Sequence, residues 1–190
     1  MADEIIQPHK PKQVHGIFAG VVDQIAVQRL ANMVSIASQQ GVDEIHLLFQ
    51  TTGGIIGDGI CLYNLFQATQ IEIFLYNAGN VASIGVIAYL GADRKLTSAN
   101  AAFMIHKTVF SPVAATVDRL QSAANAAIID DQRVETILHE HVSLSQEKWD
   151  IHRVSDLWLS AEDSVKAGLA HSIENFSPPM GEQIYYVGQT

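Results

Sequence analysis

Residues Glu44–Gln50 read EIHLLFQ, a short apolar run, and the turn Thr51-Thr52-Gly53-Gly54 follows it directly. Short apolar runs bounded by turn residues are typical of a strand buried inside a sheet. Further strands are expected at residues 14–19, 71–76, 94–97 and 101–106, with helices between most of them. Strands that alternate with helices predict an α/β fold with a largely parallel sheet.

The ends of the expected helices are marked by particular residues. Asp23 and Ser160 have the side chains and positions of N-caps, and Gly91 and Gly168 are placed to end helices. The longest helix is expected at residues 116–142, where apolar side chains fall near one stripe. A shorter one is expected to begin within residues 143–149.

The organisation predicted along the chain is simple. A chain of 190 residues is long enough for one domain with a buried core. We expect a flexible arm at residues 1–13, one folded domain at residues 14–175, and an irregular tail at residues 176–190. The tail carries Pro178, Pro179 and Gly181.

Composition excludes several classes of protein. The net charge is −9 and the 11 Lys and Arg are scattered, so a general nucleic-acid binder is not expected. The acidic start without an apolar run argues against a signal peptide, and no stretch is apolar enough to span a membrane. Cys61 is the only cysteine, which fits a reducing compartment. The sequence therefore predicts a soluble, cytoplasmic protein.

Ser83 is the first residue that could carry chemistry. It follows a predicted strand and a turn, and it stands where a helix is expected to begin, so unpaired N–H groups and the positive end of the helix dipole surround it. That environment suits a nucleophile whose attack generates an oxyanion. A serine that merely caps the helix is the commoner explanation, and this position alone leaves both open.

Three other positions complete the candidates. Gly53-Gly54 follows a buried strand and would let the backbone approach a ligand and offer its N–H groups, although an ordinary turn explains it equally. His106 ends an apolar strand and could project a base into a cleft. Asp156 could hold a histidine in the correct tautomer, or it could be a solvated acid.

Nucleotide and metal sites are not indicated. The chain has neither G-x-x-x-x-G-K-[ST] nor G-x-G-x-x-G. His139-Glu140-His141 is not H-E-x-x-H, and helical residues two apart point to different sides. We expect no metal and no cofactor.

The order of these segments along the chain and their residue patterns resemble the Clp protease proteolytic subunit family of serine peptidases. Residues 79–85 read GNVASIG, similar to that family's nucleophile motif G-Q-A-A-S-M-G, and residues 103–106 (FMIH) resemble its M-I-H motif. Residues 156–161 (DLWLSA) resemble its D-x-x-[FW]-[ML]-S-A motif, and residues 51–54 (TTGG) occupy the place of its S-P-G-G. Four linked motifs in the right order are a specific signal.

The resemblance implies a crotonase-like fold, a spiral of ββα units with a long handle helix. It assigns Ser83 as nucleophile, His106 as general base and acid, and Asp156 as the group that orients His106. The backbone N–H groups of Gly54 and Ile84 would form the oxyanion hole. The extended substrate would lie along a further set of residues: Gly53, Thr108, Val109 and Phe110.

The implied partners are a polypeptide substrate and further copies of the chain, in a ring that is heptameric and stacked in pairs. An ATP-driven unfoldase is the family's usual partner, but the N-terminal region that contacts it is longer in the family than here. The family's paired glycines are replaced by Val109-Phe110-Ser111-Pro112, and Pro112 has no N–H to donate to a bound strand.

Three alternatives to a peptidase with a Ser-His-Asp triad remain. A catalytically silent or partner-activated ring subunit would share the fold but usually lacks a triad residue. An acyl-CoA hydratase or isomerase of the same fold would rely on carboxylates for proton transfer. A Ser-Lys dyad would use Lys107, which is adjacent to His106.

Overall fold

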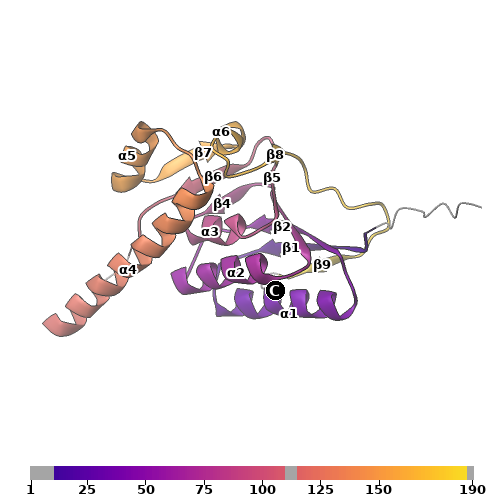
Figure 1. Cartoon of the computed structure of the whole chain (residues 1–190), viewed down its shortest axis with the longest axis horizontal. Helices are drawn as coiled ribbons and strands as arrows, with labels where there is room; N and C mark the ends of the chain where they lie inside the picture. Colours follow the sequence, from indigo (N-terminus) through magenta and orange to yellow (C-terminus); the bar gives the residue numbers. More distant parts are fainter. Residues whose placement is uncertain (1–10, 110–114, 188–190) are drawn as a thin grey trace, which may run out of the picture.

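The computed structural model describes residues 11–109 and 115–187, and its centre is a six-stranded parallel sheet. The strand order is β8-β5-β3-β2-β1-β9, with β2 and β3 in the middle (Figure 1). The strands are β1 (Gln13–Ala19), β2 (Glu44–Gln50), β3 (Glu72–Asn77), β5 (Arg94–Thr97), β8 (Ser172–Ile173) and β9 (Ile184–Tyr186). The predicted α/β class and the central place of Glu44–Gln50 are therefore confirmed.

Alternation of side chains along β2 decides which face of the sheet is the core. Ile45, Leu47 and Phe49 are buried, whereas His46 and Leu48 between them are only half-buried. The side-chain period of two along a strand sends these sets to opposite faces. The more deeply buried face belongs to the same apolar cluster as side chains from the helices.

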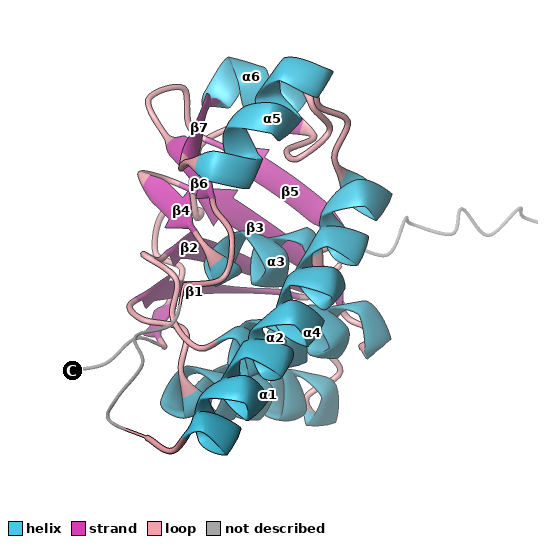
Figure 2. Cartoon of the chain, turned by 90° about the vertical axis from the view of Figure 1, so that its left-hand side faces the viewer, coloured by secondary structure: helices cyan, strands magenta, loops and turns pink. Residues whose placement is uncertain are grey.

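Three helices pack together on one side of this sheet (Figure 2). They are α1 (Gln24–Gln39), α2 (Ile56–Ala68) and α3 (Ile84–Leu90). The predicted cap of α1 is present, since the Asp23 side chain accepts a hydrogen bond from the Ala26 N–H at 2.8 Å. Gly91 does end α3, but its φ of −70° is not left-handed. The position requires glycine because a Cβ there would lie 2.7 Å from the Tyr63 carbonyl oxygen.

A second, three-stranded sheet has the order β4-β6-β7, with β4 (Asn80–Ala82), β6 (Ala102–Ile105) and β7 (Leu157–Ser160). β4 and β6 run parallel, and β6 and β7 run antiparallel. Only β6 was expected from the sequence. This small sheet brings together the chain just before Ser83, just before His106 and just after Asp156.

The long predicted helix is α4 (Val117–His141), and it extends well beyond the two sheets (Figure 1). Its flanking residues are Thr116 and Val142, as expected. Only Ile137 and Leu138, near its C-terminal end, are buried, so the rest of the helix is supported by few contacts within the chain. The two short helices that follow are α5 (Gln146–Val154) and α6 (Ala161–Lys166).

Two segments differ from the sequence-based expectation. The tail after residue 176 is not irregular throughout, because β9 pairs in parallel with β1 at the edge of the sheet. The helix that the sequence predicts to begin around Ser83 starts at Ile84, which leaves Ser83 outside it. The predicted arm at residues 1–13 lies largely outside the described residues.

Across the described residues, no helix is both long and apolar enough to cross a membrane.

Candidate active site

Ser83 occupies a strained turn between β4 and α3. Its φ and ψ are 57° and −133°, and it is the one residue other than glycine with a positive φ in the described parts of the chain. Such backbone conformations are costly for a residue with a Cβ and gather at functional sites. The Ser83 side chain makes no capping hydrogen bond to α3. The helix-cap explanation of this serine is therefore not what the structure shows.

The Ser83 hydroxyl is instead paired with His106. The distance from Ser83 Oγ to His106 Nε2 is 2.8 Å. The pairing of β4 with β6 explains this proximity, because Ala82 is the register partner of Met104 and the Ser83 N–H donates to the Met104 carbonyl at 2.7 Å. Ser83 and His106, which are 23 residues apart in the sequence, are thus brought together by one short parallel ladder.

The other ring nitrogen of His106 fixes the tautomer. Nδ1 lies 2.6 Å from the Lys107 carbonyl oxygen, which can only accept a hydrogen bond. Nδ1 therefore carries the proton in a neutral ring, and Nε2 is left to accept the proton of the Ser83 hydroxyl. This is the arrangement that a general base requires.

Among the described residues, no hydrogen bond joins Asp156 to Ser83 or His106. Asp156 immediately precedes β7, and its side chain is exposed. Within residues 11–109 and 115–187, the hydrogen-bond partner of His106 Nδ1 is the Lys107 carbonyl and not the Asp156 carboxylate. Asp156 as the third member of a triad stays a prediction.

The predicted glycine pair lies against the serine. A Cβ at Gly53 would lie 2.6 Å from Ser83 Cβ and 3.1 Å from its Oγ, and the φ of Gly53 is 98°. A Cβ at Gly54 would lie 2.1 Å from the Val22 carbonyl oxygen. Two hydrogen bonds with Val22 hold this turn in place. The Val22 N–H donates to the Gly53 carbonyl, and the Ile55 N–H donates to the Val22 carbonyl. Glycine is therefore required at both positions by close approach.

Neither of the two N–H groups predicted to form an oxyanion hole has a hydrogen-bond acceptor among the residues that the structure describes. Ile84 is the first residue of α3, so its N–H has no acceptor within the helix. The Gly54 N–H likewise has no acceptor among the described residues. That these groups bind an oxyanion stays a prediction.

A cavity of about 330 Å³ opens beside Ser83 and His106. Thr108 and Val109, which were predicted to contact substrate, line it, whereas Phe110 lies outside the described residues. About half of the wall is aliphatic, and Ser83, His106, Lys107, Thr108 and Asp130 supply its polar part. The aliphatic side chains are those of Ile55, Ile56, Ile84, Ile87, Ile105, Val109, Val134 and Leu138. An apolar side chain can pack against the aliphatic part of this wall, while the polar part lies beside Ser83 and His106.

Some residues near the site were not singled out from the sequence for this role. Lys107 donates a hydrogen bond to Glu135 of α4, and the Thr108 N–H donates to Asp131 Oδ1 at 2.8 Å. The one signal in the sequence is that Asp131 and Glu135 are four residues apart on a predicted helix and so share a face. Their contact with Lys107 depends on how α4 docks.

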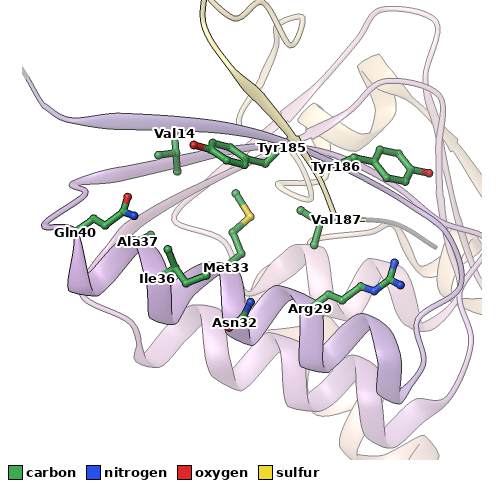
Figure 3. Close-up of a pocket in the computed structure, with 10 residues that line it drawn as sticks. All are labelled: Val14, Arg29, Asn32, Met33, Ile36, Ala37, Gln40, Tyr185, Tyr186 and Val187. Atoms are coloured by element: carbon green, nitrogen blue, oxygen red, sulfur yellow. The ribbon is translucent and has the colours of Figure 1, made fainter. Parts of the chain in front are cut away.

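A second cavity, of about 450 Å³, lies between α1 and β9 (Figure 3). Met33 extends from α1 toward Tyr185, and Arg29 lies near Val187 at one end (Figure 3). None of the predicted site residues lines this cavity.

Comparison with known proteins agrees with the motifs. Residues 13–176 match the family model described as Clp protease. The chain is 22% identical over 156 residues to the ATP-dependent Clp protease proteolytic subunit 2 of Pseudomonas aeruginosa, covering 81% of this chain and 77% of that one. It is 26% identical over 156 residues to the ATP-dependent Clp protease proteolytic subunit of Streptococcus pneumoniae, covering 80% of each.

A solved structure shares the fold. A mutant form of ClpP1 from Listeria monocytogenes aligns with a TM-score of 0.73 at 20% identity, covering 87% of this chain and 92% of that one. This likeness confirms the predicted crotonase-like architecture. Because the family model spans most of the chain, the protein belongs to the Clp protease family.

Proposed function

We propose that this protein is a serine endopeptidase that hydrolyses peptides or unfolded polypeptides through an acyl-enzyme. The observation that carries the proposal is the contact of 2.8 Å between Ser83 Oγ and His106 Nε2, made by a serine in a strained turn that does not cap its helix. Membership of the Clp protease family supports the same reaction class.

The proposed first step is attack of Ser83 Oγ on the scissile carbonyl carbon while His106 Nε2 takes the hydroxyl proton. The resulting oxyanion would accept hydrogen bonds from the Gly54 and Ile84 N–H groups. His106 then gives its proton to the leaving amine, and the peptide C–N bond breaks. Water, deprotonated by the same nitrogen, releases the acyl group, with Asp156 stabilising the imidazolium in both steps.

The proposal includes a ring of identical subunits, heptameric and stacked in pairs, that encloses the active sites. Apolar side chains on α4 support association, since Val117, Ile128 and Ile129 are 80%, 56% and 55% exposed. Such side chains clustered along one exposed element mark a contact surface. The relatives are named ATP-dependent proteases, which supports an ATP-driven unfoldase as a further partner.

Two enzyme alternatives are less well supported by the site. For a Ser-Lys dyad, Lys107 would have to reach Ser83, but its Nζ is paired with Glu135 and lies 3.9 Å from Asp131. For a hydratase or isomerase, a carboxylate is expected in the cavity beside the oxyanion donors. Asp130 lines that cavity, but it forms an ion pair of 3.0 Å with Arg133.

Labelling with a fluorophosphonate probe tests the proposal directly. An activated Ser83 would displace fluoride and form a stable phosphonate ester, which mass spectrometry of the peptide would locate. Ser83→Ala should abolish the label, while Ser38→Ala, at an exposed position on α1, should leave it unchanged. Absence of label on the assembled native protein would instead favour the silent or partner-activated subunit.

A further inference from the structure

The segment that follows His106 is anchored to α4 by two carboxylates. The Thr108 N–H donates to Asp131 Oδ1 at 2.8 Å. The Lys107 ammonium donates a hydrogen bond to Glu135 and lies 3.9 Å from Asp131 Oδ2. Asp131 and Glu135 are one helical turn apart and face the same way. Two consecutive residues are thus held by one face of one helix.

This anchored segment in turn holds the ring of His106. The Lys107 carbonyl accepts a hydrogen bond from His106 Nδ1–H at 2.6 Å, so the position of the Lys107 backbone decides where the ring lies. The same ring presents Nε2 to Ser83 Oγ at 2.8 Å. A continuous series of contacts therefore runs from α4 through Lys107 to the nucleophile.

The value of these contacts is geometric and not a large gain in stability. The side chains of Lys107, Asp131 and Glu135 are 31%, 32% and 35% exposed, and ion pairs with that access to water contribute little. Residues 106–109 belong to no helix or strand, so their backbone has no regular hydrogen bonds of its own. A charge-assisted bond to the Thr108 N–H replaces that missing support.

We propose that Asp131 and Glu135 are positioning residues, which fix the Lys107 backbone and through it hold the His106 ring against Ser83. The inference rests on the proposed function and adds a role for α4. The helix supplies Val134 and Leu138 to the wall of the cavity, and its acidic face sets the general base. A misplacement of about 1 Å in a catalytic group costs on the order of 100-fold in rate.

The test compares Asp131→Ala and Glu135→Ala with a matched control, Asp118→Ala. Asp118 is an exposed acid in the first turn of the same helix, so the control removes the same kind of side chain away from the site. For each variant, the rate of fluorophosphonate labelling at Ser83 and the kcat and KM for a peptide are measured. We expect labelling and kcat to fall about tenfold or more in the first two, with KM within about twofold.

A double-mutant cycle isolates the contact with Lys107. Lys107→Met keeps the carbonyl that binds His106 and removes the ammonium that binds Glu135. Adding Glu135→Ala to Lys107→Met should therefore cost little more than either change alone. Additive losses would overturn the role of the Lys107–Glu135 pair.

A readout that needs no activity separates this inference from the proposed function. The 15N chemical shifts of the His106 ring report its tautomer and hydrogen bonds, and amide exchange at Thr108 reports its bond to Asp131. We expect both to change in Asp131→Ala and not in Asp118→Ala. If the native protein is never labelled, the proposed function fails, while these shifts still decide the positioning role. Unchanged shifts and native labelling rates would overturn the inference, as would losses that merely follow the unfolded fraction in a parallel unfolding measurement.

Discussion

Ile105 of β6 pairs with Leu157 of β7, and His106 and Asp156 are the next residues outward on these two antiparallel strands. Side chains directly opposite in an antiparallel pair have Cβ atoms about 5 Å apart. Continuing the ladder by one step would place the imidazole and the carboxylate opposite each other. The register therefore predicts that Asp156 lies within reach of His106, whose ring is bonded to the Lys107 carbonyl.

This register makes Asp156→Asn an informative substitution. A carbonyl can orient a neutral ring but carries no full charge, so it cannot replace a carboxylate beside the imidazolium that forms during the reaction. We expect kcat for peptide hydrolysis to fall on the order of 10²–10⁴-fold. The resting 15N shifts of His106 should stay unchanged, which distinguishes this loss from that of the positioning variants.

The matched control for this change is Asp150→Asn, which alters an exposed carboxylate on α5 that is paired with Arg153. It should retain native activity. Activity within a few-fold of native in Asp156→Asn would show that the Lys107 carbonyl suffices and that the chain works with a dyad.

Gly53→Ala should inactivate the site without dismantling the fold. The new methyl group would lie 2.6 Å from Ser83 Cβ and would be held there by a φ that L-residues rarely adopt. We expect labelling of Ser83 to be lost while circular dichroism stays native. Gly20→Ala is the control, because nothing lies within 4 Å of a Cβ at that position. Normal labelling of Gly53→Ala would contradict the close approach of this turn to the nucleophile.

The aliphatic lining of the cavity beside Ser83 predicts which peptides are cut. A peptide library should show cleavage after medium-sized apolar residues, and little after acidic ones, since burying an unpaired charge is costly. Val134→Phe would fill part of the cavity and should shift the preference toward smaller residues such as alanine. Discrimination of about 10- to 200-fold per methylene-scale change is the range to look for. An unchanged preference would mean that the side chain before the cut bond lies elsewhere.

Buried histidines predict a loss of stability in mild acid. Burial lowers the pKa of His15 from its ordinary value of 6.5, and the neighbouring His46 lowers it further, against a smaller opposing effect of Glu182. The pKa of His152 is lowered as well, first by burial and then by Lys107. Below pH 6.5 the unfolded chain binds protons that the folded chain excludes, so the free energy of unfolding falls as pH decreases toward the folded pKa values.

The measurement is the urea midpoint at pH 7.5 and at pH 5.5, which we expect to be lower at pH 5.5. His15→Phe keeps a flat ring to stack on His46, 4.9 Å away between centroids, and removes one titrating group. It should therefore reduce the difference between the two midpoints. The same difference in the variant as in the native chain would show that His15 does not contribute.

Much of the fold follows from local signals that the structure retains. The cap at Asp23 and the alternation along β2 are set by side chains within a few residues of each other. The strands that the sequence did not indicate are β4, β7, β8 and β9, which have two to four residues each. Runs of two to four residues carry little periodic signal, and the pairing of these four strands depends on partners far along the chain.

The candidate site shows the same division. Ser83 and His106 could be predicted from their motifs, and the structure places them in contact. The choice of the Lys107 carbonyl over Asp156 as partner of His106 is a matter of side-chain rotamer and of how α4 docks, which no local pattern encodes. The left-handed backbone of Ser83 could not be predicted either, because it results from β4 and α3 meeting at one residue.

The short strand β9 has a consequence for self-association. A long strand at the edge of a sheet offers unpaired N–H and C=O groups to other chains, and very short edge strands reduce that hazard. In the described structure the six-stranded sheet ends in β8, with two residues, and β9, with three, so the seven-residue β1 is kept from the edge. β9 in the C-terminal tail thus covers the edge of β1, and removing it would leave β1 exposed as a template for aggregation.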